Sequence, residues 1–248
     1  MGKSFQKHYS DFYKEQIGSA VGIYPTNAAG LELGDFGTWN DGLFNKIGNI
    51  SQFDGMPSIP TEISDRYIEN IQAESDKVST SVMCGGVEVE GEIPVKENPT
   101  AASSVQYSTS KTNSFVLTFS YLNKHSIQNP GSFFEKAWDS ALKNYPKEFS
   151  TYHYRIIYEI FEAEEYALFG SSSKSSSFGI AGDASAVSNY LSGSVGASLQ
   201  KTEAENSQLS LYAYENPLVA GVNMMAYSTD RPGKLHIPHN GDSPKIGT

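Results

Sequence analysis

The chain has a single cysteine, Cys84, so no disulfide can form within it. This usage fits a reducing compartment, and we expect a cytoplasmic location for the inactive protein. Arginine is also scarce, with only Arg66, Arg155 and Arg231. Asp and Glu outnumber Lys and Arg by 28 to 18, which gives a formal net charge of −10. Nucleic acid is therefore a disfavoured partner, because neutralising phosphates requires clustered cations.

Long apolar runs are missing as well. No stretch approaches the roughly 20 consecutive apolar residues that a transmembrane helix needs. The first residues lead into polar sequence, so we expect no secretory signal peptide.

The motifs of common enzyme classes are also absent. There is no Gly-x-Ser-x-Gly elbow and no phosphate loop with its lysine. His236 and His239 form a pair without a nearby third ligand, which is a poor metal site. Glu162, Glu164 and Glu165 are typical of a solvated acidic strand end. We therefore expect no enzymatic activity, no catalytic residue, no cofactor and no metal.

The composition is sufficient for one large packed domain. Apolar residues make up 38% of the 248, with 15 Tyr and 13 Phe among the aromatic residues. We expect an α+β domain over residues 1–228. Residues 229–248 lack periodicity and are rich in proline and glycine, which predicts an unstructured or inhibitory C-terminal tail.

Two helices and a hairpin can be placed from residue spacing. Ser4–Ile17 has apolar residues three and four apart, which predicts an amphipathic helix. Ser132–Lys143 begins with a capping box and has an apolar stripe, which predicts a second helix. Asp41-Gly42 separates the runs Leu31–Trp39 and Leu43–Ile50, which predicts a β-hairpin. These elements favour a twisted antiparallel sheet flanked by helices.

Long polar strands occupy most of the remaining chain. Residues 63–122 alternate in polarity and predict one or two long hairpins, and His153–Phe169 predicts another long strand. Pro217–Tyr227 is the most apolar segment and predicts a buried strand. Gly170–Gly179 holds six serines and no large side chain before Phe178, so we expect it to be mobile.

Period-2 alternation is clearest from Val187 to Leu199, with small polar residues on one face and a mild apolar set on the other. Two interpretations are open. The segment is either a solvated sheet edge or a stored segment that becomes a membrane-spanning hairpin, since a transmembrane strand needs only about ten alternating residues. The candidate membrane-facing residues are Val187, Leu191, Val195, Ala197, Leu199, Val78, Val82, Phe115, Leu117 and Phe119. The candidate pore-lining residues are Ser188, Ser192, Ser194 and Ser198.

The order of these predicted elements resembles the pore-forming domain of the gasdermin family. The best-matching segments are Leu31–Phe36, Val78–Gly86, Tyr154–Ile160 and Pro217–Val222. The resemblance implies that two long regions, 63–122 and 154–214, refold into membrane-spanning hairpins that close into a large β-barrel of many subunits. It also implies lytic cell death or defence as the function, and inhibition by a C-terminal segment until an activating protease or regulatory partner intervenes.

The chain departs from the family pattern in being acidic, and we expect neither a second domain nor an N-terminal cysteine of the acylated kind. Under the pore-forming interpretation its partners are membrane lipids and further copies of itself. The alternatives are a soluble α+β binding or interaction module whose polar strands are surface, and an enzyme whose site leaves no sequence signal.

Overall fold

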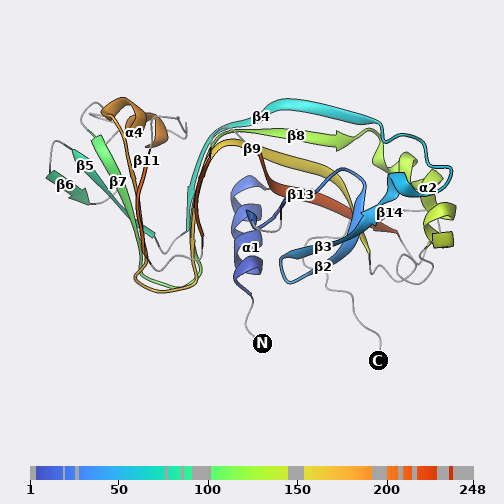
Figure 1. Cartoon of the computed structure of the whole chain (residues 1–248), viewed down its shortest axis with the longest axis horizontal. Coiled ribbons are helices and arrows are strands. Elements are labelled where there is room, and N and C mark those ends of the chain that lie inside the picture. Colours follow the sequence, from blue (N-terminus) through green and yellow to red (C-terminus); the bar gives the residue numbers. More distant parts are fainter. Residues whose placement is uncertain are drawn as a thin grey trace. The chain divides into compact units, whose positions relative to one another are not determined.

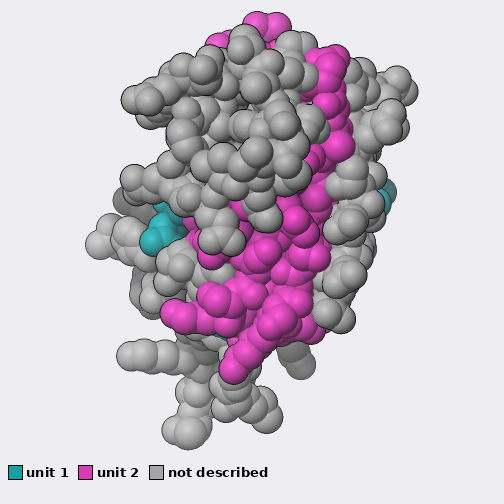
Figure 2. All heavy atoms as spheres, turned by 90° about the vertical axis from the view of Figure 1, so that its left-hand side faces the viewer, with its two compact units in different colours: residues 1–65, 124–162, 218–248 teal, residues 66–123, 163–217 magenta. Residues whose placement is uncertain are grey.

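A computed structural model of the whole chain describes part of it. The described residues are 4–18, 20–25, 28–75, 78–84, 87–90, 102–144, 154–191, 200–205, 209–213, 217–227 and 235–236. Two compact units arise from the chain: unit 1 comprises residues 1–65, 124–162 and 218–248, and unit 2 comprises residues 66–123 and 163–217 (Figure 2).

The described helices are α1 (Phe5–Ile17), α2 (Pro130–Asn144), α4 (Ala184–Leu191) and the short 3-10 helix η2 (Ile50–Gln52) (Figure 1). The first eight strands are β1 (Val21–Gly22), β2 (Asp35–Asn40), β3 (Leu43–Asn49), β4 (Thr61–Glu74), β5 (Val78–Cys84), β6 (Val87–Glu90), β7 (Ala102–Thr109) and β8 (Ser114–Ile127). They are followed by β9 (Arg155–Ser171), β10 (Ser177–Ala181), β11 (Gln200–Glu205), β12 (Leu209–Ala213), β13 (Leu218–Tyr227) and β14 (Leu235–His236).

The fold is α+β with mostly antiparallel sheets, as the sequence predicts. Among the described residues, the larger sheet has the order β1-β13-β9-β2-β3, with β8 beside β9 and β4 beside β8. The smaller sheet has the order β11-β10-β7-β5-β6 and lies within unit 2.

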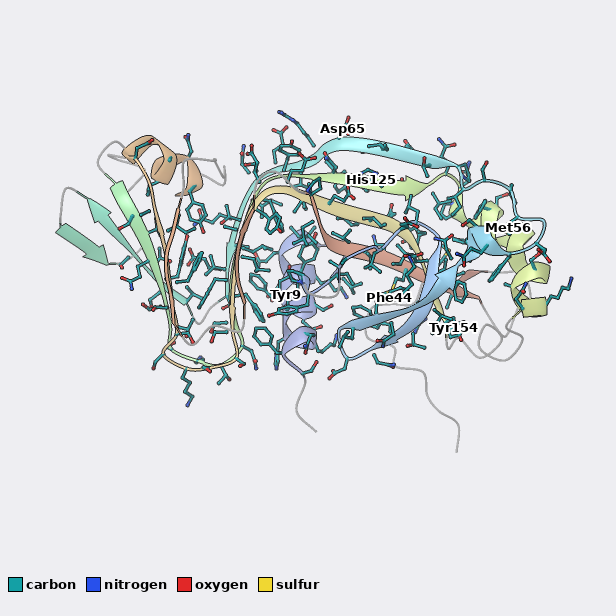
Figure 3. The ribbon with its side chains drawn as sticks, viewed as in Figure 1. Tyr9, Phe44, Met56, Asp65, His125 and Tyr154 are labelled. Atoms are coloured by element: carbon teal, nitrogen blue, oxygen red, sulfur yellow. The ribbon has the colours of Figure 1, made fainter. Side chains whose placement is uncertain are left out.

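Helix α1 in unit 1 confirms the prediction for Ser4–Ile17. The Ser4 hydroxyl caps the helix by accepting a hydrogen bond from the Lys7 amide at 3.2 Å. The aromatic face is buried, with Tyr9 pointing inward from the helix (Figure 3). Tyr13 packs against Gly22 of β1 and its register partner on β13, because a Cβ on Gly22 would lie 2.5 Å from the Cβ of Tyr13.

The β2–β3 hairpin is confirmed at the predicted turn. Asp41 and Gly42 both have positive φ, 50° and 87°, as a two-residue turn of type I′ requires. The run before it is shorter than predicted, because Gly34 has a φ of 83° and the Glu32 amide donates to the Asp35 carboxylate at 2.7 Å. Leu31–Gly34 is therefore a turn, and the strand begins at Asp35.

Helix α2 begins earlier than its predicted capping box. It starts at Pro130, and the Phe133 amide donates to the Asn129 carbonyl at 3.1 Å. Proline suits the first turn because it lacks an amide that would otherwise be unpaired there. Its residues Phe133, Phe134 and Ala141 are buried in one cluster of unit 1.

A second unit 1 cluster joins β1, β3, β9 and β13. Phe44 of β3 belongs to it, whereas Tyr154, just before β9, belongs to the cluster of α2 (Figure 3). The expected buried strand Pro217–Tyr227 is confirmed as β13, which starts at Leu218.

The predicted tail contains a short strand. Leu235 and His236 of β14 pair with the end of β13, so these two residues are not unstructured as expected. Residues 228–234 and 237–248 lie outside the described part of the chain, and the boundary at residue 228 stays a prediction.

We predict that Gly37→Ala strongly destabilises unit 1. Gly37 lies at the register shift of the β2–β3 pair, and an added Cβ would lie 1.9 Å from the Asn45 carbonyl oxygen. We expect the free energy of unfolding to fall by at least about 2 kcal/mol, measured by denaturant titration. Gly131→Ala is the matched control, because a Cβ there meets nothing within 4 Å and the site is helical. An equal loss for both variants would contradict this account.

Candidate functional site

The five-stranded sheet of unit 2 is built of aligned rows of residues. Its registers are antiparallel, and β7 is the strand shared between β5 and β10. One row joins Ser79, Ser108 and Ser177, and the row two residues further joins Ser81, Gln106 and Gly179. The rows between them join Thr80, Tyr107 and Phe178, then Val82, Val105 and Ile180.

These rows give the sheet one apolar and one polar face. Val105, Tyr107, Phe178 and Ile180 are buried in the core cluster of unit 2. On the other face, Ser79 and Ser108 are exposed, Ser81, Gln106 and Ser177 are half-buried, and Gly179 is buried. Over β5, β7 and β10 the polar rows hold uncharged side chains, and at the edges of the sheet they continue into Glu90 of β6 and into Glu203 and Glu205 of β11.

Helix α4 covers the apolar face. Its residues Ala186, Val187 and Tyr190 are buried in the same cluster as the apolar rows. Tyr190 meets Tyr107 edge to face at a centroid distance of 6.4 Å. The helix has eight residues, and it lies along β7 in unit 2 (Figure 1).

This helix corrects the prediction that Val187–Leu191 begins a strand. Asp183 caps it: its carboxylate accepts from the Ala186 amide at 2.8 Å, and its carbonyl accepts from the Val187 amide at 3.0 Å. Val187 and Tyr190 then fall on one helical face. An aspartate before Ala-Ser-Ala is a start signal that the alternation analysis missed.

The polar groups beneath α4 are incompletely paired. The buried hydroxyls of Tyr190 and Thr118 have no hydrogen-bond partner of good geometry among the described residues. Burial raises the pKa of the Tyr190 phenol to about 12. Burial also raises the pKa of the nearby Glu74 carboxyl, and a hydrogen bond from the Thr80 hydroxyl at 2.8 Å opposes that rise.

The Ser/Gly run is ordered, which corrects the expectation that it is mobile. It ends β9, turns at Ser172–Ser175 and enters β10. The buried Ser171 and Ser176 hydroxyls share a hydrogen bond, and the Ser176 amide donates to Thr109 Oγ1 at 3.0 Å. Phe178 is fully buried between Tyr107 and Phe169. Side-chain hydroxyls thus form hydrogen bonds within and to this turn, which its composition alone predicted to be too polar to pack.

The other candidate residues have mixed outcomes. Within residues 63–122, a turn at Ser110–Asn113 separates β7 from β8. Phe115, Leu117 and Phe119 of β8 are buried, and so are Val116 and Thr118 between them, so neither face of β8 is exposed there. Val78 packs against the unit 2 cluster. Leu191 and Ser188 lie in α4 and Val82 lies in β5, but their side chains are not described. The other candidates lie outside the described residues altogether: Ser192, Ser194, Val195, Ala197, Ser198 and Leu199.

The acidic residues of β9 are engaged rather than freely solvated. Glu162 lies 3.0 Å from His125 Nε2, and Glu164 accepts hydrogen bonds from Tyr121 and Asn123. In the part of the chain that the structure describes, no group of three or more His, Cys, Asp and Glu residues could hold a metal. No helix among the described residues is long and apolar enough to cross a membrane.

Comparison with solved structures gives a distant likeness. No protein-family model matches the sequence, and no curated protein matches it. The fold is similar to the structure of a bacterial gasdermin from Bradyrhizobium tropiciagri, with a TM-score of 0.31 and 10% sequence identity. The similarity covers 88% of this chain and 85% of that chain. A likeness this distant carries no argument about function, which must be made from the chain's own residues.

We predict opposite effects of removing the two phenolic hydroxyls beneath α4. Tyr190→Phe deletes a hydroxyl that lacks a good partner and should raise the free energy of unfolding by up to about 1 kcal/mol. Tyr107→Phe removes the hydroxyl that accepts a hydrogen bond from the Gln72 side-chain amide at 3.2 Å, and it should lower the free energy of unfolding by about 0.5–1.5 kcal/mol. Urea titration of both variants measures the difference, and a larger loss for Tyr190→Phe would overturn it.

The same phenols predict an alkaline loss of stability. Burial raises the pKa of Tyr190 to about 12 and raises that of Tyr107 well above its ordinary value near 10. A raised folded-state pKa contributes stability that is complete below pH 10 and is lost as pH rises through the folded value. We expect unfolding free energy to fall from about pH 10 to pH 12, less steeply in Tyr190→Phe. Identical slopes in wild type and variant would contradict this.

Proposed function

We propose that the chain is a gasdermin-like pore-forming protein that oligomerises in membranes as a large β-barrel and causes lytic cell death or defence. The observation that carries this proposal is the row pattern of the five-stranded sheet. Small uncharged polar rows alternate with large apolar rows over strands β5, β7 and β10.

The row pattern is the one that a membrane barrel needs. Alternate residues of such a strand face lipid and the aqueous lumen, and every backbone amide and carbonyl is paired with a neighbouring strand. A spanning strand takes about 9–11 residues. β5, β7 and β10 have 7, 8 and 5 residues, so they must lengthen at the membrane, whereas three other strands that overlap the two regions already reach that length. β4 and β8 have 14 residues each and β9 has 17.

The two expected inserting regions meet in this sheet. Residues 63–122 supply β5 and β7, and residues 154–214 supply β10 and β11. β7 pairs with β10, so a strand from each region already lies side by side in antiparallel register. We infer that each region extends into one hairpin of the barrel.

Helix α4 is the element that must give way. It lies inside the second region and covers the apolar rows. The alternation from Val187 to Leu199 fits a strand once the cover is released, because each residue then takes the period-2 position that the sequence provides. We propose that α4 joins β11 in a longer strand at the membrane.

Control and location form part of the proposal. We propose a cytoplasmic inactive form, membrane lipids and further copies of the chain as partners, and activation by a protease or regulatory protein. Residues 229–248 are the candidate inhibitor, and their described strand β14 pairs with β13. We propose no catalytic role for any residue.

A soluble interaction module is the second candidate. The burial of the apolar face favours such a module, because the core residues of the five-stranded sheet are fully buried. Membrane leakage distinguishes the two functions.

We predict that the purified chain releases dye from liposomes, and does so faster without residues 229–248. Both anionic and neutral vesicles should be used, because the net charge of −10 opposes anionic lipid. If neither form causes leakage from any vesicle, the pore-forming function is wrong and the interaction module replaces it.

A matched pair of lysine variants tests the strand assignment. Val195→Lys should cost about 2–4 kcal/mol on a lipid-facing strand at the bilayer midplane and abolish leakage. Ser194→Lys, one position away on the lumen side, should leave leakage nearly intact. Thermal unfolding checks that both variants are folded, and equal leakage from the two would show that this segment does not span the bilayer.

A further inference from the structure

The long strands β4 and β9 contain, in their unit 2 parts, left-handed residues that are not glycine. Arg66 and Asn70 of β4 have φ values of 49° and 53°, and Glu165 of β9 has 46°. Positive φ is uncommon outside glycine, and inside a strand it interrupts the pleat and bends the chain. Three such residues in two strands of one sheet call for a physical cause.

Side chains on β8 and β9 hold these bends in place. The amide of the left-handed Arg66 donates to Asn123 Oδ1 at 2.9 Å, so a side chain takes the place of a ladder carbonyl. Asn123 Nδ2 donates to Glu164 Oε1 at 2.9 Å, immediately before the left-handed Glu165. One amide side chain thus connects the bend of β4 to the bend of β9.

A tyrosine completes the arrangement. The Tyr121 hydroxyl donates to Glu164 Oε2 at 2.6 Å, and the Arg66 guanidinium lies 5.1 Å from the centre of the Tyr121 ring. The hydrogen bond to Glu164 is the main cause of a raised pKa at the Tyr121 phenol. We call Arg66, Tyr121, Asn123 and Glu164 the clasp.

We propose that the clasp is a conformational latch that keeps β4 and β9 bent and thereby keeps the strands of unit 2 from extending. The inference rests on the proposed function. A barrel-spanning strand needs regular pairing along its length, and a left-handed residue interrupts that pairing. Opening the clasp lets Arg66, Asn70 and Glu165 return to extended geometry.

Substitution at the exposed Asn70 tests the backbone part of this latch. Valine disfavours positive φ whereas glycine accepts it, so the two variants push the bend in opposite directions. We expect Asn70→Val to speed dye release by about tenfold and to raise hydrogen exchange in β4. Asn70→Gly should leave the rate of dye release and the rate of hydrogen exchange in β4 at or below their wild-type values. Glu62→Val is the control, because Glu62 is exposed on the same strand and is not left-handed.

Substitution within the clasp tests its side chains. Asn123→Ala removes both amide hydrogen bonds and should speed exchange in β4 and β9. Tyr121→Phe keeps the ring beneath Arg66 and removes only the bond to Glu164, so it should act in the same direction and less strongly. Circular dichroism shows whether each variant is folded. If Asn123→Ala does not fold, the milder Tyr121→Phe carries the test.

The two readouts separate the latch from the pore. Faster exchange in Asn70→Val and Asn123→Ala supports the latch even if no variant or wild type leaks vesicles, a result that would overturn only the proposed function. Wild-type leakage with unchanged exchange and unchanged leakage rates in Asn70→Val, Asn123→Ala and Tyr121→Phe would overturn the latch and leave pore formation standing.

Discussion

The apolar rows of the five-stranded sheet in unit 2 must be kept from water, and α4 covers them together with residues of β8 and β9, namely Val116, Ala167 and Phe169. Val105, Tyr107, Phe178 and Ile180 are almost completely buried, and full burial of such a side chain is worth about 1.5–3 kcal/mol. An isolated helix of eight residues is not stable in water. The helix therefore depends on the sheet face for its stability, and losing the helix would expose the part of that face that it covers.

This dependence links the fold to the proposed function. Lipid is an alternative apolar environment for the same rows, and the serine and glutamine rows remain compatible with water in both environments. The hydroxyls of Tyr190 and Thr118 lack a partner of good geometry among the described residues, which reduces the stability gained from covering the sheet with α4. The clasp acts on a different part of unit 2, through the backbone of β4 and β9.

Sequence predicted the elements whose signals are local. Ser4 begins α1, Asp41-Gly42 makes the first hairpin, and the apolar run Leu218–Tyr227 is a buried strand. Each of these depends on a cap, a turn or a run that acts over a few residues. The α+β class follows from the same signals.

The candidate site was less predictable because its signals are ambiguous or non-local. Residues 187–191 fit both a strand and a helix, and Asp183 together with the sheet face beneath decides for the helix. The serine turn before β10 is ordered by Thr109, which is distant in sequence. The rows of the sheet depend on register between β7 and β10, which no single strand specifies.

The most direct test of the central claim places an environment-sensitive fluorophore on single cysteines at residues 104 to 108, in a chain whose native Cys84 is replaced by serine. After incubation with liposomes, the account predicts alternation: probes at Val105 and Tyr107 report lipid and are quenched by a lipid-borne quencher. Probes at Ser104, Gln106 and Ser108 report water. Uniform signals along β7, unchanged by the membrane, would contradict the claim that this sheet supplies membrane-spanning strands.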